Sequence, residues 1–118
     1  MYTIGLNKMD LANVGSGLGL KEAADTKVEG VLNGFGSLVA ERVDEATGEV
    51  KQETLSIVKV DGIVYSGASK VVDGRLNNLK AIVGESTDVQ DGKISVKFEN
   101  IKLAKGTGSN LIITRYDE

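Results

Sequence analysis

The sequence contains no cysteine, histidine, proline or tryptophan among its 118 residues. Without cysteine, a disulfide framework and a thiolate metal site are both excluded, and without histidine the usual general base is missing. Most hydrolase, deaminase and oxidoreductase sites depend on one of these groups. The composition therefore favours a small accessory protein over an enzyme, and we expect no catalytic residues, no cofactor and no bound metal.

Long apolar runs are missing as well, because uninterrupted apolar stretches span only a few residues where a membrane helix needs about 20. The N-terminus, MYTIGLNKMDL, lacks the basic segment and apolar stretch of a signal peptide. The content of 41% hydrophobic and 26% charged residues is typical of a globular domain of this length. We expect one intracellular domain over residues 1–118, with no membrane partner.

Positive charge is concentrated near the C-terminus, although the net charge of −3 by itself does not indicate a nucleic-acid partner. Between residues 93 and 115 a single acid, Glu99, faces five basic side chains: Lys93, Lys97, Lys102, Lys105 and Arg115. A basic stripe of this kind could follow a phosphate backbone. The alternative is a solvated strand face on which lysines protect a sheet edge.

The first third of the chain is expected to contain an arm followed by a hairpin. Residues 1–20 end in NVGSGLGL and show no sustained period, which predicts a flexible Gly-rich arm. Strands are predicted over residues 27–32 and 36–44. Asn33-Gly34 between them is a strong two-residue hairpin signal.

Two further turn signals delimit the next strands. Thr47-Gly48 precedes a segment rich in β-branched residues, 53–60, and Asp61-Gly62 precedes the short strand 63–65. The pattern predicts hairpins in series.

The period changes after Tyr65. Apolar residues then recur at spacings of four, three and four, which predicts one buried helix face: Val72, Leu76, Leu79 and Val83. Ser66 or Ser69 can cap its N-terminus, and Gly84 occupies the place of a left-handed C-terminal residue. Gly74 inside this helix costs about 1 kcal/mol relative to alanine.

The last segments return to the period of a strand. In KISVKFENIKLAK one face carries Ile94, Val96 and Phe98, whereas the later apolar residues have the opposite parity, which predicts a bulge near Glu99-Asn100. A final strand is predicted over residues 111–116. The order of elements suits a mainly β, five-stranded antiparallel OB-like barrel with its helix between strands three and four. An open antiparallel sheet with one covering helix gives the same order.

Three segments resemble catalytic or ligand-binding motifs without matching them. Residues 15–21, GSGLGLK, fit neither the Walker loop nor the dinucleotide fingerprint. Gly67-Ala68-Ser69 lacks the closing glycine of a nucleophile elbow, and adjacent helical residues such as Ser69 and Lys70 point in different directions. Asp88 and Asp91 do not have the spacing of a calcium loop.

Aromatic rings near cations remain as the strongest functional signal. Rings that stack on bases and cations that follow phosphates hold single-stranded nucleic acid without sequence preference. Tyr65 and Tyr116 lie at the ends of predicted strands, while Phe98 shares the parity of the core. Arg115 and Tyr116 alternate in direction, so one ligand cannot contact both along a regular strand.

Between about residue 49 and 114 a series of short motifs occurs in this order: Glu53-Thr54, Asp61-Gly62, Tyr65-Ser66, Ser69-Lys70, a helix with apolar repeats, Val96-Lys97 and Lys105-Gly106. In the order of these motifs the segment resembles the small single-stranded DNA-binding proteins of protein-primed Bacillus phages. The resemblance implies a non-catalytic protein that coats and protects displaced strands during phage DNA replication in the cytoplasm of the infected bacterial host. It also places Tyr65 and Lys70 on the family's tyrosine and lysine.

Two functions therefore stand side by side. The first is sequence-independent single-stranded DNA binding, with phage replication proteins as further partners and these contact residues: Tyr65, Lys70, Lys97, Lys102, Lys105, Arg115 and Tyr116. The second is a structural or assembly role, as a virion or scaffold component whose exposed β edges self-associate into a homo-oligomer. Tyr65 itself has the alternative of packing against the helix, and its exposure distinguishes the two.

Overall fold

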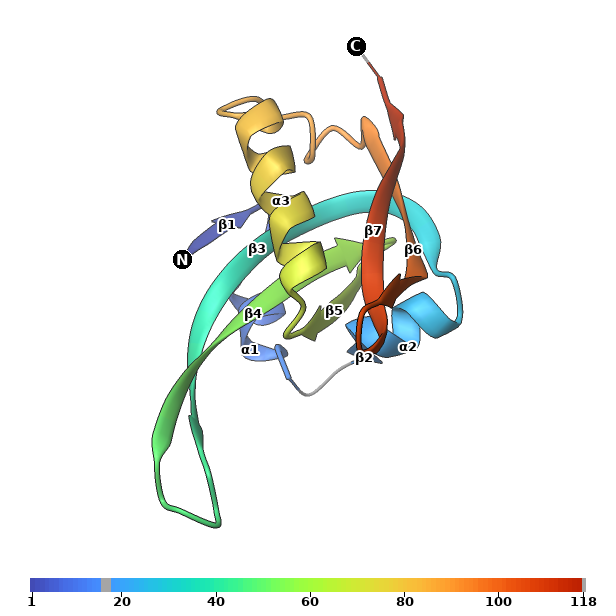
Figure 1. The fold of residues 1–118 in the computed structure, drawn as a ribbon. Coiled ribbons are helices and arrows are strands. Elements are labelled where there is room, and N and C mark those ends of the chain that lie inside the picture. Colours follow the sequence, from blue (N-terminus) through green and yellow to red (C-terminus); the bar gives the residue numbers. More distant parts are fainter. Residues whose placement is uncertain (16–17, 118) are drawn as a thin grey trace.

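The computed structural model of the protein describes residues 1–15 and 18–117. Within this part of the chain there are seven strands and three helices (Figure 1). In chain order they are β1 (Tyr2–Ile4), α1 (Lys8–Ala12), β2 (Leu18–Gly19), α2 (Leu20–Asp25), β3 (Glu29–Val43), β4 (Val50–Val60), β5 (Ile63–Gly67), α3 (Lys70–Val83), β6 (Ile94–Leu103) and β7 (Gly106–Tyr116).

The strands form one strongly curled sheet in the order β2-β5-β4-β3-β6-β7, and β1 pairs with β3 off this path. The long strand β3 causes the curl, because residues 32–43 pair with β4 while residues 29–31 pair with β6. The result is a half-barrel with α3 across its concave side (Figure 1). The predicted mainly β architecture is confirmed.

The prediction of five strands, all antiparallel, with a single helix is wrong. Strands β1 and β2 add to the sheet, β2 runs parallel to β5, and α1 and α2 add two helices. All four elements lie in the N-terminal quarter of the chain, where residues 1–20 were expected to form an irregular arm. They contain two to six residues each, which is too short for a hydrophobic period to emerge.

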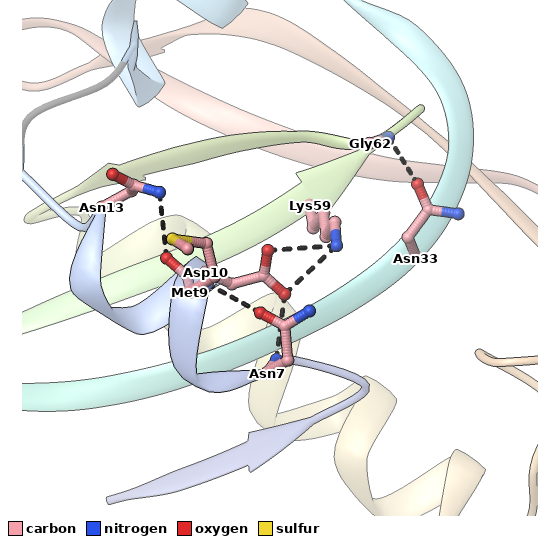
Figure 2. A network of polar contacts seen from close by, with 7 residues as sticks. All are labelled: Asn7, Met9, Asp10, Asn13, Asn33, Lys59 and Gly62. Carbon is pink, nitrogen blue, oxygen red and sulfur yellow. Dashed lines mark hydrogen bonds and ion pairs between the residues drawn. The ribbon is translucent and has the colours of Figure 1, made fainter.

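The hairpin predicted at Asn33-Gly34 is also wrong, because β3 continues through both residues with a register shift between Leu32 and Gly34. The Asn33 side chain accepts a hydrogen bond from the Gly62 backbone N–H at 2.7 Å (Figure 2). A Cβ atom on Gly34 would lie 2.8 Å from the Gly5 carbonyl oxygen. The dipeptide therefore provides a bulge and a close backbone approach rather than a turn.

Other local predictions are confirmed. The loop at Thr47-Gly48 joins β3 to β4, and Asp61 and Gly62 both adopt positive φ, 49° and 81°, in the turn before β5. Ser69 caps α3 by accepting the Val72 N–H at 3.2 Å. Gly84 follows the helix with φ 56°. The four predicted apolar residues of α3 are all buried: Val72, Leu76, Leu79 and Val83.

The bulge in the last hairpin lies elsewhere than predicted. The β6–β7 register runs without interruption from Val96 to Leu103, and the shift lies between Ser95 and Val96. The predicted core residues Ile94, Val96 and Phe98 are fully buried, whereas Leu103 is 42% exposed. No bulge at Glu99-Asn100 therefore turns the later apolar residues back to the core side, because the hairpin extends past the core. In the described part of the chain no helix is long and apolar enough to cross a membrane.

Candidate nucleic-acid interface

Tyr65 is a core residue. It lies in β5 with only 4% of its surface exposed, and its ring packs against Phe98 with the centroids 5.5 Å apart. A ring enclosed in this way offers no face to a base. This position does not agree with the expectation that Tyr65 stacks on DNA. It agrees with the alternative that Tyr65 is a packing residue.

Tyr116 and Arg115 are engaged in contacts with the segment before β6. The Tyr116 hydroxyl donates a hydrogen bond to Asp88 at 2.6 Å, which raises the pKa of Tyr116 and lowers the pKa of Asp88. The Arg115 guanidinium donates to the Gly92 carbonyl at 2.7 Å and lies 3.3 Å from the Asp117 carboxylate. These interactions fix the end of β7 and leave Arg115 only partly available to a ligand.

The predicted basic stripe is divided between separate places. Lys97 lies in the middle of β6, half-buried and opposite Glu29 and Ile112. Lys102 and Lys105 lie exposed at the far end of the β6–β7 hairpin, where Leu103 pairs with Gly106. A ligand that follows the hairpin end therefore meets Lys102 and Lys105 without Lys97.

Lys70 and Lys21 line a common groove of about 540 Å³. Its walls come from three places in the chain: the β2–α2 junction, the β5–α3 junction and the β6–β7 hairpin. Hydroxyl groups and glycines occupy the same walls, among them Ser66, Ser69, Thr107, Gly19, Gly67 and Gly108. None of the described residues that line the groove carries a carboxylate.

The groove forms because the sheet does not close between β5 and β7. Strand β2 takes the free edge of β5, through the pairs Leu18 with Tyr65 and Gly19 with Ser66. Helix α2 then contacts β5, β6 and β7. Leu20 of this helix is buried, and a Cβ on Gly67 would lie 3.4 Å from it. A side chain at position 67 would thus fill the space between the two walls.

Charge changes sign along this side of the molecule. The N-terminus of α3 at Ser69 faces the groove, and the helix dipole adds partial positive charge to that of Lys70. A second hollow of about 450 Å³ shares Ala68, Ser69 and Lys70 with the groove but also contains Glu53 and Asp73. Lys70 therefore lies between a groove whose described lining has no carboxylate and a hollow that contains two.

Sequence reasoning missed Lys21. It belongs to the segment 15–21, whose Ser16 and Gly17 lie outside the described residues. Its place in the groove depends on the parallel pairing of β2 with β5, in which Leu18 pairs with Tyr65. No local signal in the sequence indicates such a pairing.

In the described part of the chain no cluster of three or more Asp or Glu side chains could hold a metal ion. The Ser69 hydroxyl oxygen accepts the Val72 N–H in the helix cap. Comparison with protein-family models, curated proteins and solved structures found no match for this chain.

Proposed function

We propose that this protein binds single-stranded DNA without sequence preference and that the groove between Lys21 and Lys70 holds the sugar-phosphate backbone. The observation that supports this most directly is the presence of two lysines in the lining of a groove whose described residues carry no carboxylate. Lys102 and Lys105 on the adjoining hairpin extend the positive surface. Lysines that neutralise phosphates release condensed counterions, which favours binding to any sequence.

We also propose that β3 to β7 and α3 form an OB-type barrel. Strands β5, β4, β3, β6 and β7 are neighbours in the sheet in that order. Along the chain α3 lies between β5 and β6, the third and fourth of these five strands. OB domains bind oligonucleotides beside the loop that joins their last two strands. The groove lies beside the corresponding turn at Ala104-Lys105.

The burial of Tyr65 changes the expected character of binding. Of the five aromatic residues, three are buried in the core and Tyr2 and Tyr116 are half-buried, so stacking is replaced by contacts to phosphates. Each stacked base would otherwise contribute about 1 to 3 kcal/mol. Binding is then weak and strongly dependent on salt, as suits a protein that coats displaced strands during phage DNA replication and is easily removed.

The test is fluorescence anisotropy with a labelled oligo(dT) at two salt concentrations, with the duplex of the same length as a competitor. Lys21→Ala and Lys70→Ala should each weaken binding and reduce the slope of log K against log salt by about 0.7. Lys8→Ala, an equal charge change in α1, is the matched control. Absence of binding at low salt, or equal loss in the control, would refute the proposal.

A further inference from the structure

A long two-stranded arm, residues 38–55, projects from the half-barrel (Figure 1). The last pair that β1 makes with β3 is Tyr2 with Ser37, and β5 pairs with β4 only as far as Ser56. Beyond these positions β3 and β4 pair only with each other, through six residue pairs that end at Val43 and Val50. Within the described part of the chain both outer edges of the arm are unpaired. Two-stranded ribbons of this kind are only marginally stable in water.

One face of the arm exposes three valines to solvent. Val39, Val43 and Val50 are 52%, 60% and 60% exposed. Val43 is directly opposite Val50, and Val39 lies four residue pairs further along the same face, beyond the Glu41–Gln52 pair. An exposed pair of valines near the end of a projecting element indicates contact with another protein surface.

The arm also carries all of the net negative charge. Residues 38–55 contain five acidic and two basic residues, a net charge of −3, which equals the net charge of the whole chain. The remaining 100 residues are therefore neutral in sum. A negatively charged arm repels nucleic acid and favours a basic partner surface.

The groove of a second copy has the complementary properties. It presents Lys21 and Lys70, and its lining also includes two apolar residues that a partner can reach, the half-buried Val71 and the 42% exposed Leu103. We propose that the arm of one copy docks in the groove of another, with its valines on these apolar residues and its carboxylates near the two lysines. Arm and groove are different surfaces, so a variant can remove one side of the contact and keep the other.

Docking of the arm and binding of DNA then exclude each other, because both occupy the groove. Free protein associates with itself, and an added single strand displaces the arms and releases single copies. The arm-groove contact is measured without DNA, so it can fail or succeed separately from the proposed DNA binding.

The experiment is sedimentation velocity at low salt over a range of concentrations, with two variants that each remove one side of the contact. The arm variant is Glu41→Lys with Val43→Ser, and the groove variant is Lys21→Glu with Lys70→Glu. We expect the wild type to associate and each variant alone to remain a single copy, with affinity reduced at least about tenfold by the like charges. An equimolar mixture of the two variants should form a complex of two copies and nothing larger.

Glu85→Lys, in the segment after α3, is the control for the arm charge reversal and should associate like the wild type. A wild type that stays a single copy at every concentration overturns the proposal, as does an arm variant that still associates or a mixture that does not. If circular dichroism shows that the arm variant perturbs the hairpin, Glu49→Lys with Val50→Ser repeats the test from the other strand. A groove variant that loses association but binds oligo(dT) normally would reject the DNA proposal and retain this one.

Discussion

The Lys59 ammonium group lies 3.0 Å from one oxygen of Asp10 and 3.1 Å from the other, and this contact fastens α1 to β4 (Figure 2). Asp10 also accepts the Asn7 backbone N–H at 2.9 Å, while the Asn7 side chain accepts the Asp10 N–H, so the pair forms a capping box. Both side chains are largely buried, with 10% of Asp10 and 19% of Lys59 exposed. The N-terminal segment is therefore held to the sheet by a charged contact as well as by β1.

The Asp10 contact predicts a loss of stability in acid. Hydrogen bonding from Asn7 and then from Lys59 lowers the pKa of Asp10, so its stabilising effect is complete above the unfolded pKa of about 3.9 and is lost as the pH falls through the folded pKa. Lys59→Met should cost about 1 to 3 kcal/mol at neutral pH, because a buried charge loses a partner.

Urea unfolding at about pH 7 and at a series of lower pH values measures this difference, which should shrink in acid as Asp10 becomes protonated in both proteins. Lys105→Met, at the exposed hairpin turn, should change little at any pH. A Lys59→Met penalty that persists unchanged in acid would show that Lys59 acts through packing of its aliphatic chain.

The surroundings of Tyr2 predict a loss of stability in alkali, opposite to the loss in acid predicted for Asp10. Its ring makes an edge contact with Phe35, with centroids 6.0 Å apart, and Lys80 lies 4.3 Å above it. Burial and then the charge of Asp73 raise the pKa of Tyr2 to about 12. The unfolded chain releases this proton near pH 10, so stability is lost as the pH rises from about 10 towards the folded value.

Tyr2→Phe should remove this alkaline loss. It should also leave stability at neutral pH unchanged or raise it by up to about 1 kcal/mol, because the buried Tyr2 hydroxyl has no hydrogen-bond partner among the described residues. Denaturant unfolding at about pH 8 and about pH 11 tests both effects. Loss of more than about 1 kcal/mol at the lower pH would mean that the hydroxyl has a partner after all.

The sequence predicted the elements whose signals are local. The helix of Val72, Leu76, Leu79 and Val83 and the turn at Asp61-Gly62 depend on periodicity and on residues that tolerate positive φ, and both occur where expected. The core position of Phe98 followed from strand alternation. Such features are decided within a few residues of chain.

The features that create the candidate site depend on distant contacts. Asn33-Gly34 has the composition of a hairpin turn, but the approach of Gly5 to Gly34 makes the continuous strand possible. Lys21 lines the same groove as Lys70 only because β2 takes the edge of β5. Whether Tyr65 faces solvent or core depends on Phe98, which is 33 residues away along the chain. Tertiary packing overrides local preference at each of these positions.

Tyr65 should be required for stability and not for DNA binding. Tyr65→Ala removes a ring from the core next to Phe98 and should cost about 3 to 5 kcal/mol. Tyr65→Phe preserves the ring and should leave both the fold and the affinity for oligo(dT) close to wild type. Thermal unfolding measures the stability of each variant, and fluorescence anisotropy on the same samples measures its affinity for oligo(dT). A folded Tyr65→Phe protein with strongly reduced DNA affinity would mean that the tyrosine hydroxyl contacts DNA in the bound state.

Two glycines should respond to alanine with opposite sign. Gly36 of β3 pairs with Thr3 of β1, and a Cβ atom there would lie 2.6 Å from the Tyr2 carbonyl oxygen. Because that neighbour is backbone, Gly36→Ala must displace β1 and should cost about 1 to 3 kcal/mol.

Gly74 lies inside α3, and a Cβ atom there would meet nothing within 4 Å among the described residues. Gly74→Ala should therefore stabilise the protein by about 0.5 to 1 kcal/mol through the higher helix propensity of alanine. Urea unfolding of the two single variants measures both effects, and hydrogen exchange of β1 amides should rise in Gly36→Ala alone. If Gly36→Ala is as stable as the wild type and its β1 amides stay protected, β1 does not lie against β3 as closely as its pairing with residues 35–37 requires.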